Sequence, residues 1–118
     1  MKIQITAQKT LAQISDEFAA LFPALRLKFF AEPHGVGEKS SLWDTLNMEL
    51  PIAEVAAFDH PESLEVTPQM QVQTLEHRFQ EMFKIGMQVM RADGDQWIQT
   101  TTTDYWTLEE ENIEGQRC

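Results

Sequence analysis

Residues 5–22, ITAQKTLAQISDEFAALF, and residues 66–83, VTPQMQVQTLEHRFQEMF, decide the fold because they carry one apolar pattern twice, 61 positions apart. In each stretch apolar residues recur at every third or fourth position, the period of a helix that buries one face. Four positions are identical: Thr6 and Thr67, Gln8 and Gln69, Phe18 and Phe79, Phe22 and Phe83. We therefore expect an internal duplication, with pseudo-repeats over residues 1–58 and 62–115. Two unrelated amphipathic helices would give the same spacing, because each buries one stripe on a core.

The sequence around the first helix predicts two strands that flank it. Residues 2–6 alternate polar and apolar side chains, which is typical of a half-buried strand. Thr10 and Gln13 have the spacing of a capping box, so we expect a helix from there to Pro23, where the ring prevents its continuation. Residues 25–29 then alternate apolar and basic side chains, which predicts the second strand.

The segment that follows has weaker signals. Residues 31–41 are rich in Gly, Ser and Pro, and we expect a loop there. Residues 42–50 fit either a strand or a short helix, and we favour a strand over residues 43–48. Pro51 suits the first position of a short helix that runs to residue 57.

The second unit repeats this order. We expect in turn a strand, a helix and a strand, over residues 63–67, 70–84 and 86–91. Asp93-Gly94 between two extended runs predicts a hairpin with a returning strand over residues 96–102. Thr107 and Glu110 form a second capping box, which opens a terminal helix that Gly115 should close.

Each half thus consists of a strand, a helix and two strands, followed by a short helical turn. The chain of 118 residues has the size of one domain. Two such halves predict the α+β class, with a mixed sheet of about six strands and two main helices on one face around a shared core. The opposite sheet face would carry mainly polar side chains: Lys2, Gln4, Arg26, Lys28, Gln88 and Gln99, with Phe30 or Met90.

Composition limits the classes of partner. Acidic residues outnumber basic ones by 19 to 9, and the formal net charge is -10. This charge argues against nucleic acids and anionic membranes, which proteins bind through clustered Lys and Arg. The single cysteine, Cys118, excludes an internal disulfide, and the N-terminal residues lack the apolar run of a signal peptide or membrane span. We expect a cytoplasmic, bacterial protein without a cofactor.

A first candidate site lies in the predicted loop, in the run His34-Gly35-Val36-Gly37-Glu38-Lys39-Ser40. Glycines before Lys-Ser are typical of loops that bind phosphate through backbone amides. Here Glu38 separates Gly37 from Lys39, so the spacing is wrong and the carboxylate would repel phosphate. We interpret the run as a connection between strands in which His34, Glu38 and Lys39 are available to a ligand or partner.

Two further patterns resemble metal sites but lack the necessary ligands. His34, His60 and His77 lie in separate segments and have no spacing that would place them on one metal ion. Asp93-Gly94-Asp95 lacks the remaining oxygen ligands of a calcium loop, and a hairpin turn explains it. We expect no metal.

A second candidate site is the run of four threonines before Asp104, Tyr105 and Trp106. Hydroxyl groups and aromatic rings in series suit a binding edge, with Thr101 and Thr103 beside the acid and the two rings. The same residue types are also good strand formers, and we favour this structural role over a binding one. No partner residue is fixed by spacing, and the pattern supports no catalytic assignment.

The stretches LFPALRLKFF at residues 21–30 and WIQTTTTDYWTL at residues 97–108 resemble a group of small bacterial proteins of unknown function. The two motifs cover both halves of the chain. The resemblance implies no activity, cofactor or site residue.

These observations favour a non-enzymatic interaction or adaptor domain that binds a protein partner or a second copy of itself. The alternative is a small enzyme or ligand-binding protein with its site between the 31–41 loop and the segment from Thr100 to Trp106. A third reading, which the acidity fits equally well, is one component of a larger assembly. An open strand edge without a deep pocket would favour the first, and a pocket where His34, Glu38 or Asp104 converge would favour the second.

Overall fold

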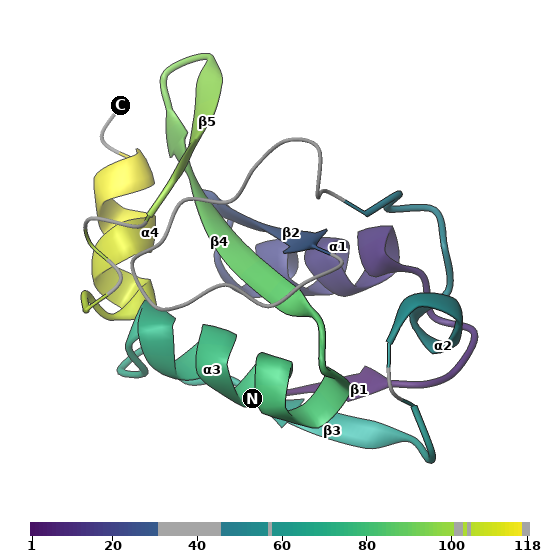
Figure 1. Ribbon diagram of the computed structural model, residues 1–118. Helices are drawn as coiled ribbons and strands as arrows, with labels where there is room; N and C mark the ends of the chain where they lie inside the picture. The colour runs from purple at the N-terminus through teal and green to yellow at the C-terminus, as the bar shows by residue number, and fades with distance from the viewer. Residues whose placement is uncertain (31–45, 57, 101–102, 104, 117–118) are drawn as a thin grey trace.

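Figure 1 shows the computed structural model of the chain, which describes residues 1–30, 46–56, 58–100, 103 and 105–116. These residues form four helices and five strands, which confirms the α+β class. The helices are α1 (Leu11–Leu21), α2 (Ile52–Val55), α3 (Val72–Phe83) and α4 (Leu108–Gln116). The strands are β1 (Lys2–Ile5), β2 (Leu25–Phe30), β3 (Glu62–Glu65), β4 (Gly86–Asp93) and β5 (Gln96–Gln99).

The strands form two antiparallel sheets, so the single mixed sheet expected from the sequence is wrong. β1 pairs with β3 in one sheet, and the other has the order β2-β4-β5. Strands that correspond in the two halves therefore pair with each other, β1 with β3 and β2 with β4, and only β5 pairs with a neighbour in its own half. Periodicity specifies which face of a strand is buried but not which strand lies beside it, and this is why the sheet was wrongly predicted.

The registers of the two ladders have a common property. In the first ladder Lys2 pairs with Glu65 and Gln4 pairs with Ser63; Ser63 lies 61 positions after Lys2, and Glu65 lies 61 positions after Gln4. In the second ladder Leu27 pairs with Val89 and Phe29 pairs with Met87; Met87 lies 60 positions after Leu27, and Val89 lies 60 positions after Phe29. Each ladder therefore looks the same from either of its strands, as it would around a local two-fold axis.

Backbone hydrogen bonds that begin the helices follow the same correspondence. Leu11 N donates to Leu50 O, and 61 positions later Val72 N donates to Trp106 O. The return bonds also match, since Ile52 N donates to Lys9 O and Leu108 N donates to Met70 O. In both halves the segment after the strands thus returns to the start of the long helix, and the last helix of that half begins there.

One hydrophobic core joins α1 and α3 to β2, β4 and the β1–β3 ribbon. Phe18 of α1 and Phe79 of α3 are both fully buried. The Phe79 ring lies 5.2 Å from Phe29 and 4.8 Å from Phe83, between ring centroids. Among the described residues, the Phe18 ring has one aromatic neighbour, Phe22, at 5.3 Å. The second helix therefore makes the denser aromatic cluster.

Both predicted capping boxes and the predicted hairpin are confirmed. Gln13 N donates to Thr10 Oγ1 and Thr10 N donates to Gln13 Oε1, and Thr107 and Glu110 repeat this pair of bonds. Gly94 has φ +63, the conformation that the first central residue of a tight hairpin turn of type II′ requires.

Gly115 does not close α4, which continues to Gln116. Its lack of a side chain instead allows close packing, because a Cβ there would lie 2.7 Å from Cβ of Ala24.

Other local expectations are wrong for physical reasons. Residues 46–48 are not a strand, and the rest of that prediction falls outside the described residues. Phe30, Gln88 and Met90 lie on the sheet face opposite the core, yet they are buried and not solvated. β5 ends at Gln99, since Thr100 bonds to β4 through its side chain; residues 101 and 102 of the predicted strand fall outside the described residues. None of the helices in the described ranges has the length and apolar character needed to cross a bilayer.

Candidate functional site

The structure describes three of the eight residues that the sequence suggested for binding. Thr103 is half-buried, Tyr105 is 59% exposed and Trp106 is half-buried. The other five fall outside the described residues: His34, Glu38, Lys39, Thr101 and Asp104. The structure therefore places Thr100, Thr103 and Trp106 beside β4 and α4 and leaves the loop site untested.

Side chains take over the hydrogen bonds of β4 where β5 leaves it. Thr100 Oγ1 donates to Val89 O at 3.0 Å, and Val89 N donates to Glu76 Oε2 of α3 at 3.0 Å. Gln88 Nε2 also donates to Glu76 Oε2, at 3.2 Å. Because Gln88 and Thr100 are buried, these bonds satisfy polar groups that would otherwise be costly to remove from water.

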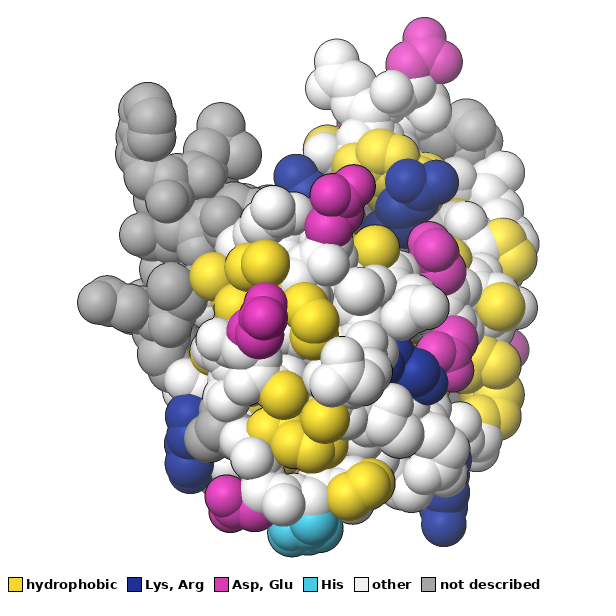
Figure 2. Space-filling model, turned by 90° about the vertical axis from the view of Figure 1, so that its right-hand side faces the viewer, with side chains coloured by type: hydrophobic (Ala, Val, Ile, Leu, Met, Phe, Trp, Pro, Cys, Tyr) yellow, Lys and Arg dark blue, Asp and Glu magenta, His cyan; other side chains and the backbone are white. Residues whose placement is uncertain are grey.

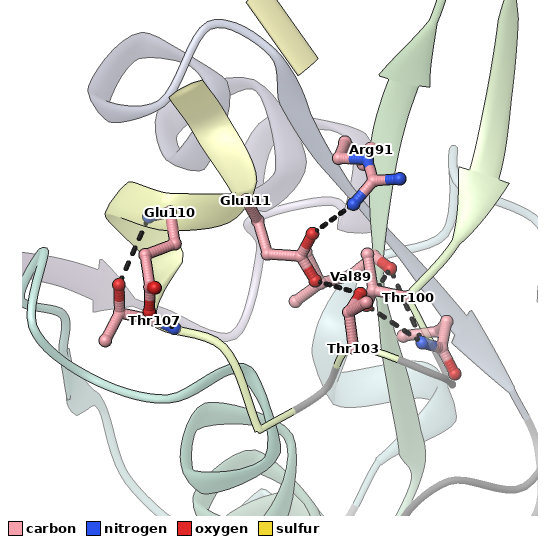
Figure 3. A network of polar contacts seen from close by, with 8 residues as sticks. Val89, Arg91, Thr100, Thr103, Thr107, Glu110 and Glu111 are labelled. Carbon is pink, nitrogen blue, oxygen red and sulfur yellow. Dashed lines mark hydrogen bonds and ion pairs between the residues drawn. The ribbon is translucent and has the colours of Figure 1, made fainter. Parts of the chain in front are cut away.

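A second group of contacts surrounds Glu111 (Figure 3). Glu111 projects from α4 and is fully buried. Arg91 Nη1 donates to its Oε1 at 2.6 Å, and Thr103 Oγ1 donates to its Oε2 at 2.6 Å. Burial raises the pKa of the Glu111 carboxyl above its ordinary value of 4.5, although hydrogen bonds from Thr103 and Arg91 lower it in part. The indole of Trp106 lies 5.8 Å from the Arg91 guanidinium and covers it.

This arrangement stabilises the fold and offers little to a substrate. Glu111 is fully buried and both of its oxygens accept hydrogen bonds from neighbouring side chains, so the carboxylate is not accessible to a substrate. Thr103 therefore binds Glu111 in place of a ligand, and Trp106 covers Arg91.

Sequence reasoning missed Glu111 and Arg91 because a charged residue is normally expected on the surface. One signal was present: Glu111 shares a helix face with Leu108 and Gly115, three and four positions away, which are both buried.

The described residues contain no group of three side chains suited to a metal ion. His60 and His77 are exposed, and each contacts one carboxylate, of Glu62 and Glu81 respectively. These are two separate surface pairs, and His34 falls outside the described residues.

The outer strand edges differ in whether their backbone N–H and C=O groups have hydrogen-bond partners or are protected by charges. On β2, Leu27 N donates to Ser15 Oγ at 3.0 Å and Phe29 O accepts from Leu46 N at 2.8 Å. On β1, Lys9 Nζ donates to Gln4 O. β3 ends in acidic residues at both sides, and charges of this kind discourage strand addition.

β5 has an open edge at Trp97. Ala92 N donates to Ala24 O, so even-numbered residues of β4 direct their backbone toward β2 and odd-numbered ones toward β5. Arg91 therefore exchanges hydrogen bonds with Ile98, and the N–H and C=O of Trp97, the next residue along, point away from β4. No described residue supplies a hydrogen bond to these two groups.

A cavity of about 320 Å³ lies beside β2 and the first half of α1. Its walls include three charged side chains, Asp16, Arg26 and Lys28, and three large apolar or aromatic ones, Met48, Met90 and Trp97. The Arg26 guanidinium lies 4.5 Å from the centroid of the Trp97 ring. The sequence suggested no site here, since Arg26 and Lys28 were expected only as a solvated sheet face.

Figure 2 looks onto the side of the molecule that carries α2. Apolar side chains form several separate groups there, with acidic and basic side chains between them. A broad apolar docking area is therefore absent from the described part of this face, and backbone groups and the cavity are the better candidates for recognition.

No protein-family model, curated protein or solved structure matches this chain.

Proposed function

We propose that the protein is a non-catalytic interaction module that binds an extended segment of a partner protein along the open edge of β5. The observation that carries the proposal is the contrast between strand edges. Side chains, backbone groups or charges protect β1, β2 and β3, whereas the N–H and C=O of Trp97 lack a described partner. An unprotected edge is a template for strand addition.

The chemistry around β5 favours a particular kind of segment. Trp97 and Ile98 are half-buried, so each retains apolar surface that a partner side chain can cover. Asp93 and Asp95 flank the turn of the β4–β5 hairpin and are exposed. Figure 1 shows this hairpin projecting from the rest of the fold, where a second chain can approach it. An extended segment with apolar side chains and a Lys or Arg near the turn fits best.

The burial of Glu111 supports a binding role over catalysis. Burial raises the pKa of its carboxyl, and its two oxygens are held by Thr103 and Arg91. Perturbed acids of this kind are functional candidates only when they face a cleft, and this one is enclosed by α4 and β4.

We also infer that the two halves arose by duplication of one strand–helix–strand unit. The inference is supported by the self-consistent registers of both ladders and by the matched hydrogen bonds at the starts of α1 and α3. Two unrelated amphipathic helices would share their apolar spacing but not these backbone contacts.

Trp97→Pro and Trp97→Ala form a matched pair that tests the proposed interface. Both remove the indole, but only proline removes the outward N–H, and an edge strand tolerates proline at such a position. Dodecapeptides would be selected from a random library against the native protein and their affinities measured by calorimetry. We expect peptides with alternating apolar residues and a basic end, bound at least about tenfold more weakly by Trp97→Pro than by Trp97→Ala. Equal affinities for the two variants, or a library without binders, would contradict strand addition at β5.

A further inference from the structure

The cavity beside β2 combines charge with apolar walls, and this combination identifies a class of ligand. Its volume of about 320 Å³ is at the lower end of the range of small-molecule sites. The walls come from α1, β2, β4, β5 and residue Met48, so elements of both halves of the chain fix its shape. A site of this size accommodates a single ring or a short alkyl chain.

The charges in the cavity are not already neutralised. Arg26 and Lys28 are alternate residues of β2 and lie on the same strand face, about 7 Å apart along the strand. Neither forms an ion pair with any residue in the described part of the chain, although acidic residues outnumber basic ones by 19 to 9. Asp16 lines the α1 side, so among the described lining residues two cations face one acid, which gives one net positive charge. This balance favours a monoanion over a dianion.

Contacts with neighbouring side chains and backbone hold the polar groups of the cavity in position. The Trp97 ring lies 4.5 Å from the Arg26 guanidinium and restricts its motion. Ser15 is buried and its Oγ accepts from Leu27 N at 3.0 Å, which leaves the hydroxyl hydrogen without an acceptor among the described residues. A carboxylate between Arg26 and Lys28 would accept from both cations and from this hydroxyl.

We propose that this cavity binds a small monocarboxylate with an apolar body. The carboxylate lies between Arg26 and Lys28, and the body packs against Trp97 and the two methionines, Met48 and Met90. Methionine is flexible and polarizable, so this wall adapts to either an aryl or an alkyl group. The site shares the Trp97 indole with the proposed β5 interface, but its charged contacts come from β2 and it does not use the outward backbone groups of β5.

Methionine methyl signals provide a direct test. The chain would be labelled with ¹³C at the methionine ε-methyl groups and titrated with 3-phenylpropionate or octanoate. We expect saturable shifts of the Met48 and Met90 signals, while Met1, which is 49% exposed and does not line the cavity, stays unchanged. The neutral 3-phenylpropionamide and the cationic phenethylamine should bind at least about tenfold more weakly, because neither replaces the carboxylate.

Charge variants separate this site from general attraction to a basic patch. Arg26→Gln and Lys28→Gln should each weaken binding about five- to tenfold, a moderate loss because Arg26 is exposed and Lys28 is half-buried. Lys2→Gln, at an exposed position of β1, makes the same change in net charge away from the cavity and should leave affinity unchanged. Equal binding of the amide and the carboxylate, or shifts that Arg26→Gln and Lys28→Gln do not weaken, would overturn the proposal. Neither variant changes Trp97, so failure here leaves the proposed β5 interface standing.

Discussion

In the first half of the chain, Ser15 of α1 accepts a hydrogen bond from the outer edge of β2. In the second half, two elements cover the outer edge of β4: a side chain of α3 and the strand β5. Glu76, 61 positions after Ser15, accepts a backbone N–H from one part of β4, and β5 pairs with the rest. Both helices thus supply an acceptor to a strand edge from the same position. The second half then extends the framework outward by one strand, and this strand presents the open edge.

The last helices of the two halves also differ, and again the second half has the larger element. α2 has one turn and buries Ile52, whereas α4 has nine residues and buries Leu108, Glu111 and Gly115. The two helices therefore begin at matching places in their halves but differ greatly in length and in the residues they bury. The comparison shows that the common framework determines the core, while the second half's added strand and longer helix supply the buried ion pair and the proposed interface.

The largest expected effect distinguishes the two aromatic cores. Phe79→Ala and Phe18→Ala should each lower the free energy of unfolding by about 3–5 kcal/mol. The loss should be greater at Phe79, because its ring contacts two aromatic neighbours and Phe18 contacts one. Urea denaturation followed by circular dichroism measures both values, with exposed Ile113→Ala as a control expected within about 0.5 kcal/mol of wild type. A larger loss at Phe18 would reverse the comparison.

The buried ion pair has no counterpart among the described residues of the first half, and its removal tests that difference. Glu111→Ala leaves the Arg91 guanidinium, whose side chain is 16% exposed, without its carboxylate, and should cost about 3 kcal/mol. Val55→Ala, at the matching place in α2, should cost about 1 kcal/mol. Glu111→Gln retains an acceptor for Arg91 and should cost about 1–2 kcal/mol in the same urea experiment. If the Gln and Ala variants are equally unstable, the contact with Arg91 contributes no net stability.

The two capping boxes should be equivalent. Thr10→Ala and Thr107→Ala each remove an acceptor for one backbone N–H, of Gln13 and Glu110 respectively, and should each cost about 1 kcal/mol. Thr6→Ala serves as the control, since the exposed Thr6 caps no helix. Thermal unfolding of the three variants would show whether the helix starts are as similar in energy as in geometry. If only one of the two substitutions lowered stability, the helix starts would match in backbone geometry but not in energy.

The smallest expected effect is a dependence on pH. Because its pKa is raised, folded Glu111 binds a proton more readily than Glu111 of the unfolded chain. Proton binding by folded Glu111 therefore adds to the free energy of unfolding. This contribution is fully present below the ordinary pKa of 4.5 and is lost as pH rises through the raised pKa of the folded state. Wild type should therefore gain stability relative to Glu111→Gln as the pH falls toward 4.5. Urea titrations of both proteins at several pH values test the sign, and a relative loss on acidification would contradict burial as the main cause of the shift.

The sequence predicted elements that depend on neighbours along the chain. Both capping boxes, the helices around Phe18 and Phe79, and the turn at Gly94 follow from spacing within a few residues. The pairing of β2 with β4 joins residues about sixty positions apart, for which periodicity carries no information. Gly115 was predicted to end a helix, because the close approach to Ala24 is a tertiary contact.

The site was less predictable than the fold. Thr103 and Trp106 were selected for their chemistry, but their partners Glu111 and Arg91 are charged residues for which burial was not expected. The cavity depends on Arg26, Trp97 and Met48, which come from three separate segments. Only the folded chain brings such residues together, so composition and spacing gave no signal for it.

Amide hydrogen exchange of the free monomer tests the central claim most directly. We predict that the Trp97 amide exchanges at least about a hundredfold faster than the amides of Ile98 and Leu27. The Ile98 amide faces β4, and the Leu27 amide donates to Ser15. That result would establish an open edge at β5 before any partner is known. A Trp97 amide as well protected as those of Ile98 and Leu27 would show that the edge is already closed and would contradict the proposed interface.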